Sequence, residues 1–100
     1  MEVTINQEGS KTFVILNGRI DTTNADNFQQ SIAPLMQLTN PDIEINCAGM
    51  EYTSSQGLRI FLMLQKSVMA NKGSMVLTQM RPQVKEVFDI TGFSNIIKIV

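Results

Sequence analysis

Two adjacent hydroxyl groups stand where an apolar strand pattern, Ile43 to Cys47, gives way to a long helical pattern. They belong to Ser54 and Ser55, in the segment that reads Thr53-Ser54-Ser55-Gln56-Gly57-Leu58-Arg59. A helix start leaves backbone N–H groups unpaired and carries partial positive charge, so a serine there can cap the helix or hold a phosphate. Local physics favours helix caps for both serines, with a phosphorylation site as the alternative.

The size and composition of the chain are typical of one globular domain spanning residues 1–100. Hydrophobic residues make up 43% and charged residues 17% of the sequence, which is enough for a single core. Eight basic and nine acidic residues give a net charge of −1, which argues against a nucleic-acid partner. The longest apolar run, Ile60 to Leu64, is far shorter than the roughly 20 residues of a membrane span. We therefore expect a cytoplasmic protein without membrane insertion.

The first third of the chain predicts a hairpin followed by a helix. Two β-branched-rich segments, 3–7 and 12–17, are separated by a four-residue turn, and Gly18 ends the second segment. Thr23 and Asp26 have the spacing of a capping box, and apolar residues recur at helical spacing after them. Pro34 should kink this helix or end it early.

The rest of the chain predicts alternating strands and helices. The segments are a strand over 43–47, a helix from the serine pair to about Asn71 with Gly73 as its C′ glycine, a strand over 74–78, a helix from Arg81-Pro82 to Gly92, and a strand over 96–100. The side chains expected to face the sheet from the second helix are Leu58, Phe61, Leu62 and Met69. Strands joined by a helix pair in parallel through a right-handed crossover. The order β-β-α-β-α-β-α-β therefore predicts an α/β fold, with a mixed sheet of about four to five strands and helices mainly on one face.

The side chains that most often carry catalysis or bind metals are scarce. Histidine is absent and Cys47 is the single cysteine, which excludes a nitrogen–sulfur metal site and favours a packing role for Cys47 over a reactive thiol. The carboxylates show no motif-like pairing, and neither a dinucleotide fingerprint nor a phosphate-loop lysine motif occurs. We expect a protein that is not an enzyme and that holds no metal and no cofactor of its own.

Three sequence blocks occur in a specific order and spacing. They read Leu16-Asn17-Gly18-Arg19-Ile20-Asp21-Thr22-Thr23-Asn24-Ala25, then Tyr52-Thr53-Ser54-Ser55-Gln56-Gly57-Leu58-Arg59, then Val84-Lys85-Glu86-Val87-Phe88-Asp89-Ile90-Thr91-Gly92-Phe93. With these blocks the chain resembles, over essentially its whole length, a stand-alone STAS domain of the anti-sigma factor antagonist family. The resemblance implies a STAS-like fold and a regulator that works by partner switching.

The same resemblance implies a phosphorylation site at Ser55. In the best-known branch of the family the switch reads Asp-Ser-Ser-Gly-Leu, and the partner kinase phosphorylates the serine two places before the glycine. Counting back from Gly57 gives Ser55, while Ser54 stands in the aspartate's place and Gln56 in the second serine's place. The neighbouring hydroxyl of Ser54 is the runner-up.

The partners are also implied by the resemblance. The unphosphorylated domain would bind an anti-sigma factor that is itself a serine kinase, and this would free a sigma factor for transcription. Phosphorylation would eject the domain, and a metal-dependent serine phosphatase would reset it; ATP and metal belong to these partners, and the free chain is expected as a monomer. The implied partner-binding residues are Asp21, Thr22, Thr23, Asn24, Thr53, Ser54, Ser55, Gln56, Gly57, Arg59 and Met63.

Two other functions stay open at this point. A STAS interaction subunit without a phosphoswitch, such as a regulator of a transporter ATPase, would use the serine pair only as structural residues. A small nucleotide- or lipid-binding module would use the pocket between the strand end and the second helix.

Overall fold

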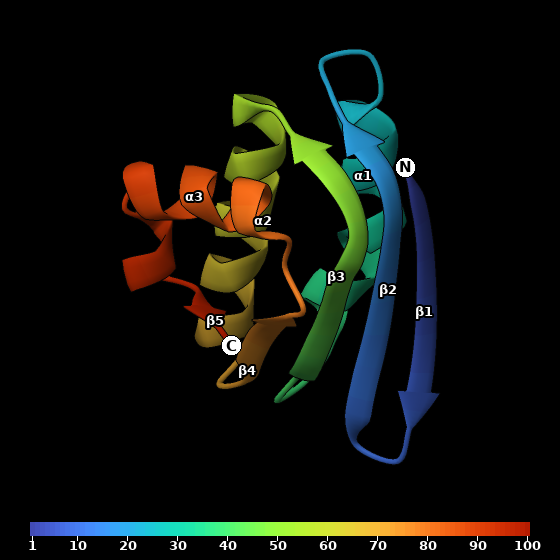
Figure 1. Cartoon of the computed structure of the whole chain (residues 1–100). Coiled ribbons are helices and arrows are strands. Elements are labelled where there is room, and N and C mark those ends of the chain that lie inside the picture. Colours follow the sequence, from blue (N-terminus) through green and yellow to red (C-terminus); the bar gives the residue numbers. More distant parts are fainter.

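Five strands form one mixed sheet in the order β1-β2-β3-β4-β5 in the computed structural model, which describes residues 1–100. The strands are β1 (Glu2–Glu8), β2 (Lys11–Ile20), β3 (Asp42–Thr53), β4 (Ser74–Thr78) and β5 (Lys98–Ile99). β1 pairs with β2 in antiparallel orientation, and the three other neighbouring pairs are parallel. Figure 1 shows the three longest strands, β1 to β3, side by side. The expected parallel pairing of β3 and β4 is confirmed.

Three α-helices and two short 3₁₀ helices connect the strands. They are α1 (Ala25–Ile32), η1 (Ala33–Gln37), α2 (Ser55–Ala70), α3 (Pro82–Ile90) and η2 (Phe93–Asn95). No helix has both the length and the apolar character that crossing a membrane requires. The order of elements is the one that the sequence predicts, with the 3₁₀ helices added.

The helices cover one face of the sheet. On β2, Val14 and Leu16 are buried, whereas Ile15 between them keeps 39% of its surface exposed. The same alternation on β3 buries Ile43 and Ile45 and leaves Glu44 half-exposed. Since side chains alternate between the two faces of a strand, one face carries the core and the other stays open. The predicted one-sided arrangement is confirmed.

The centre of the core is a row of three aromatic rings from the three helices. Phe61 of α2 lies between Phe28 of α1 and Phe88 of α3, with ring centroids 5.4 Å and 5.6 Å apart. All three side chains are almost fully buried. Because α1 and α3 flank α2 on both sides, the buried face of α2 is centred on Phe61. The prediction that Met69 faces the sheet is wrong, since this side chain keeps 59% of its surface exposed.

Two strands are longer than the apolar pattern predicts. β2 continues past Gly18 to Ile20, and β3 runs from Asp42 to Thr53, where only 43–47 was expected. The pairing of β2 with β3 shifts register on either side of Asn17 and Gly18, and Gly18 has φ 112. These irregularities break the alternation on which a sequence-based assignment depends.

The turn between β1 and β2 is also shorter than predicted. Glu8 pairs with Lys11, so only Gly9 and Ser10 lie between the strands. Gly9 has φ 62, a backbone conformation that tight hairpin turns require and that glycine adopts without strain.

The predicted end of α1 agrees with the structure, whereas the predicted exit of α2 does not. α1 ends at Ile32, and Pro34 lies in the first turn of η1, so the expected early break is confirmed. The left-handed residue after α2 is Lys72, with φ 60, and not Gly73. A Cβ at Gly73 would lie 2.1 Å from the carbonyl oxygen of Pro41. Glycine is therefore needed here because the two backbone segments come too close for a side chain.

Cys47 is a core residue. It has no exposed surface, and burial raises the pKa of its thiol to about 12. A thiol that stays protonated and inaccessible is a poor nucleophile. The predicted packing role is confirmed.

Candidate functional site

The ends of β2 and β3 bring two distant sequence segments together. Ile20, the last residue of β2, pairs with Thr53, the last residue of β3. The backbone N–H of Ser54 donates a hydrogen bond to the carbonyl of Ile20 at 2.8 Å. The loop that begins at Asp21 and the serine pair that opens α2 therefore leave the sheet at the same edge.

The two serines have different structural roles. Ser54 is the N-cap of α2: its backbone is extended, and its Oγ accepts a hydrogen bond from the N–H of Gly57 at 3.2 Å. Only 8% of its surface is exposed. Ser55 is the first residue of the helix and is exposed, and its hydroxyl forms no hydrogen bond within the chain. The prediction that both serines act as caps is therefore wrong for Ser55, because one cap satisfies the free N–H of Gly57.

Gly57 lets the first turn of α2 lie directly on the strand ends. A Cβ at this position would be 2.3 Å from Oγ1 of Thr53 and 2.9 Å from Cγ2 of Ile20. Thr53 is itself buried and donates its hydroxyl proton to the carbonyl of Ser54 at 3.2 Å. The position of Ser55 is thus set by close contacts beneath it.

Hydrogen bonds centred on one carboxylate hold the neighbouring loop. Oδ1 of Asp21 accepts hydrogen bonds from the hydroxyl and backbone N–H of Thr23 and from the N–H of Asn24. The amide of Asn24 in turn accepts from the N–H of Asp21 at 2.9 Å and donates to the carbonyl of Arg19 at 2.8 Å. The hydrogen bonds from Thr23, and then from Asn24, lower the pKa of Asp21. The loop therefore carries a fixed negative charge beside the start of α2.

This network overturns the predicted capping box of Thr23 and Asp26. The helix starts one residue later than expected, with Asn24 at the N-cap position and no side-chain cap. The hydroxyl of Thr23 is already used by Asp21, so it is not available to the helix.

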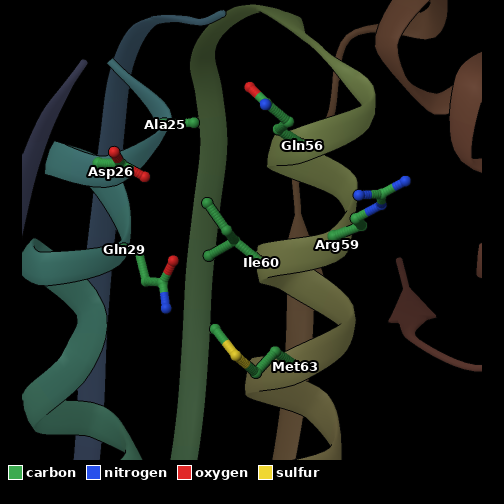
Figure 2. A pocket seen from close by; sticks show the side chains of 7 residues that line it. All are labelled: Ala25, Asp26, Gln29, Gln56, Arg59, Ile60 and Met63. Carbon is green, nitrogen blue, oxygen red and sulfur yellow. The ribbon is translucent and has the colours of Figure 1, made fainter. Parts of the chain in front are cut away.

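A shallow groove of about 220 Å³ lies between α1 and α2. Its lining residues are Ala25, Asp26, Gln29, Gln56, Arg59, Ile60 and Met63. Figure 2 shows Gln29, Ile60 and Met63 pointing into the space between the helices, while the guanidinium of Arg59 points away from α1. Met63 keeps 37% of its surface exposed. The groove thus has an apolar floor and a rim with one carboxylate and one guanidinium group.

The residues predicted for partner binding divide into a surface group and a supporting group. The exposed residues are Thr22, Thr23, Ser55, Gln56, Arg59 and Met63, and Asp21 and Asn24 are half-buried. Thr53, Ser54 and Gly57 are buried, so they position the surface without forming it.

One exposed pair at this edge was not among the predicted site residues. The guanidinium carbon of Arg19 lies 4.6 Å from the ring centroid of Tyr52, which keeps 42% of its surface exposed. Stacked arginine and tyrosine side chains are frequent at protein interfaces. Both residues stand in the sequence blocks quoted above, but only the register of β2 with β3 shows that they are neighbours.

Comparison with known proteins gives a family and two curated relatives of similar length. A family model described as STAS domain matches residues 2–100. The anti-sigma-B factor antagonist of Bacillus subtilis is 29% identical over 99 residues, which cover 99% of this chain and 90% of that protein. BtrV of Bordetella bronchiseptica, a candidate anti-sigma factor antagonist, is 27% identical over 99 residues, which cover 99% of this chain and 85% of that protein.

Solved structures show the same fold. The anti-sigma factor antagonist SpoIIAA of Bacillus has been solved in its unphosphorylated form, which matches with a TM-score of 0.78 and 18% identity and covers 99% of this chain and 88% of that chain. Its phosphorylated form matches with a TM-score of 0.72 and 16% identity and covers 99% of this chain and 91% of that chain.

Proposed function

The chain belongs to the STAS domain family, and from this premise we propose that it is an anti-sigma factor antagonist controlled by phosphorylation of Ser55. In its unphosphorylated form it binds an anti-sigma factor that is a serine kinase, and this binding frees a sigma factor. Phosphorylation of Ser55 releases the chain from the kinase, and a serine phosphatase restores the binding form. The observation that carries this proposal is the exposed hydroxyl of Ser55 at the start of α2, in a chain whose curated relatives are named as antagonists.

Accessibility favours Ser55 over Ser54 as the phosphorylated residue. A kinase must bring the γ-phosphate of ATP in line with the attacking hydroxyl oxygen. The Oγ of Ser54 lies in the buried cap and accepts the hydrogen bond of Gly57, so phosphorylating it would open the start of α2. The hydroxyl of Ser55 is exposed, and phosphorylating it disrupts no contact of the fold.

The charge of a phosphate is sufficient for the switch. It adds about −1.5 to −2 charges and three acceptor oxygens, and the helix N-terminus stabilises them by about 0.3–1 kcal/mol in an exposed position. In a docked interface the same group must lose water, and the loop that carries the Asp21 carboxylate leaves the sheet at the same edge as the serine pair. A penalty of about 3 kcal/mol, which is ordinary for a mismatched buried charge, weakens binding about 100-fold.

The switch requires no change of fold. The phosphorylated and unphosphorylated forms of SpoIIAA both match this chain over 99% of its length. We accordingly expect phosphorylated and unphosphorylated forms of this chain to have the same secondary structure, and a large change in far-ultraviolet circular dichroism would contradict this.

The groove between α1 and α2 is better suited to a partner's side chain than to a free small molecule. Its volume of about 220 Å³ is below the range of about 300–1,000 Å³ that is typical of small-molecule pockets. Arg59, which lies four residues after Ser55 and therefore on the same side of α2, stands at the rim of the groove. We propose that the anti-sigma factor contacts this groove, the Asp21 loop and Ser55 together.

The proposal is tested with the kinase that copurifies with the chain from its native cell. After incubation with this kinase and ATP, intact-mass measurement should show one added phosphate on the parent chain and none on Ser55→Ala. Ser54→Gly removes the other hydroxyl at a cost of only a few tenths of a kcal/mol, because glycine is tolerated at an N-cap, and this variant should still gain the phosphate.

Two results would contradict the proposal. If Ser54→Gly abolishes phosphate incorporation and Ser55→Ala does not, the modified residue is Ser54. If an ATP-hydrolysing kinase binds the chain but never modifies it, the chain is an interaction module without a phosphoswitch. Copurification of a transporter subunit in place of a kinase would favour that second function directly.

A further inference from the structure

Arg59 is the arginine of α2, the helix that begins at Ser55. Its guanidinium group has no ion-pair or hydrogen-bond partner. The two ion pairs of the structure are Lys11 with Glu44 and Lys85 with Asp89. Arg59 takes part in neither of them, and its side chain donates no hydrogen bond. It is exposed and lies at the rim of the groove between α1 and α2. An exposed, unpaired cation is free to pair with a negative charge that appears beside it.

Helix geometry places this cation within reach of the modified serine. Ser55 and Arg59 are four residues apart in α2, which corresponds to a rise of about 6 Å along the axis and to the same side of the helix. In this orientation the anion lies toward the helix N-terminus and the cation toward the C-terminus, which is the favourable order for an ion pair four residues apart. Arginine also offers the planar pair of donors that phosphate oxygens accept best.

We propose that a phosphate on Ser55 forms an ion pair with Arg59 within the same helix. This inference rests on the proposed phosphorylation of Ser55 and specifies how the modified surface is arranged. Phosphorylation then changes two charges of the docking surface: it adds an anion at the helix start, and it removes a free cation from the rim of the groove. A partner that places an acidic side chain against Arg59 loses that contact as well.

The other arginines of the chain are less available to the phosphate. Arg19 stacks on Tyr52, and Nε of Arg81 donates to the carbonyl of Ala48 at 2.9 Å. Asp26 lines the same groove as Arg59, yet the two side chains form no ion pair in the structure. Neither of the nearby carboxylates, Asp21 and Asp26, forms an ion pair with Arg59. Its guanidinium group is therefore free to bind a phosphate.

The test uses protein in which phosphoserine is incorporated at position 55 during translation, so that no kinase is needed. Phosphorus NMR of this protein follows the second proton dissociation of the phosphate as a function of pH. A neighbouring guanidinium favours the dianion. The acid dissociation constant of this second step should therefore be about twofold larger in the parent than in Arg59→Gln, as an ion pair four residues apart implies. Because the pair is exposed, this difference should shrink at high salt.

Two matched variants make the result specific. Lys66→Gln removes one exposed positive charge from the same helix, eleven residues and about 16 Å beyond Ser55, and should leave the dissociation constant of the phosphate unchanged. Arg19→Gln removes the other arginine at this edge and should also leave it unchanged. Circular dichroism of each variant checks that the fold is intact.

The possible outcomes separate this inference from the proposed function. An equal dissociation constant in the parent and in Arg59→Gln overturns the ion pair, as does an equal decrease in Lys66→Gln or a decrease found only in Arg19→Gln. None of these results bears on whether a kinase modifies Ser55. Conversely, a chain that no kinase modifies would contradict the proposed function, while this titration would still report whether Arg59 binds the installed phosphate.

Discussion

The first turns of α2 and α3 both leave backbone N–H groups without partners in the helix, but the two helices begin with different residues. Each helix begins after a strand of the parallel part of the sheet. α3 begins with Arg81 at the N-cap and Pro82 in its first turn, without a side-chain cap. α2 begins with a serine that caps Gly57 and a second serine that the cap does not use. The start of α2 therefore carries one more hydroxyl than its fold needs, and this excess hydroxyl is the one at the surface.

The largest expected effect is on the affinity for the proposed partner, an anti-sigma factor that is a serine kinase. Ser55→Asp places a negative charge in the first turn of α2 and should weaken binding of the kinase by about 10- to 100-fold, because the carboxylate must be desolvated beside the Asp21 loop. Ser55→Ala should bind as tightly as the parent. Isothermal titration calorimetry against the kinase measures both variants.

The start of α3 supplies the control for this experiment. Gln83→Asp adds the same charge in the first turn of α3, where Gln83 is exposed, and should leave the affinity unchanged. Equal weakening by Gln83→Asp would show that the partner responds to the net charge of the chain and not to the start of α2.

The second expected effect is on stability. Gly57→Ala improves helix propensity by about 1 kcal/mol, but the new Cβ would lie 2.3 Å from Oγ1 of Thr53. Overpacking in a buried contact costs about 1–3 kcal/mol or more, and we expect it to exceed the propensity gain, with a lower thermal midpoint than the parent. Gln56→Ala, at the exposed neighbouring position, should not lower the midpoint.

A second substitution tests the cause of this destabilisation. Gly57→Ala combined with Thr53→Ala removes the nearest clashing atom, so the two changes together should cost less than the sum of their separate effects. Strict additivity would show that the contact with Thr53 does not determine the need for glycine.

The sequence predicts those parts of the fold that depend on local chemistry. Pro34 ends α1, Gly92 follows α3 with φ 81, and the helix between β3 and β4 enforces their parallel pairing. These features follow from the restricted backbone of proline, the permissive backbone of glycine and the handedness of crossovers. No distant contact is needed to infer them.

The errors arise where a contact that the sequence pattern does not reveal competes with a local preference. Thr23 has the local spacing of a helix cap, but Asp21 takes its hydroxyl. The two serines look equivalent in sequence, and only the packing of Gly57 on Ile20 and Thr53 decides which of them is buried. The neighbours Arg19 and Tyr52 likewise require the register of two parallel strands. The sequence therefore predicts which segments form the candidate site. Which of their residues are buried supports and which are exposed depends on tertiary contacts.

The smallest expected effect is on the pH dependence of stability, and it involves one aspartate beside the start of α2 and one on α3. The pKa of Asp21 is lowered by its hydrogen bonds from Thr23, and the pKa of Asp89, near the end of α3, is lowered by Ser94 and Lys85. A carboxyl group whose pKa is lowered in the folded state contributes stability above its unfolded pKa of about 3.9, and this contribution is lost as the pH falls through the folded-state pKa. Asp21→Asn and Asp89→Asn should each flatten the decrease of the thermal midpoint below about pH 4.

Partner binding distinguishes these two aspartates where the pH dependence does not. Asp21 holds the loop beside Ser55 through three hydrogen bonds to Oδ1, whereas Asp89 lies on α3 with an exposed ion pair. At neutral pH, Asp21→Asn should weaken kinase binding a few-fold, less than Ser55→Asp does, because an amide oxygen still accepts hydrogen bonds but the charge is gone. Asp89→Asn should leave binding unchanged. If both variants weaken binding equally, the docking surface extends to the end of α3, and the start of α2 is not its centre.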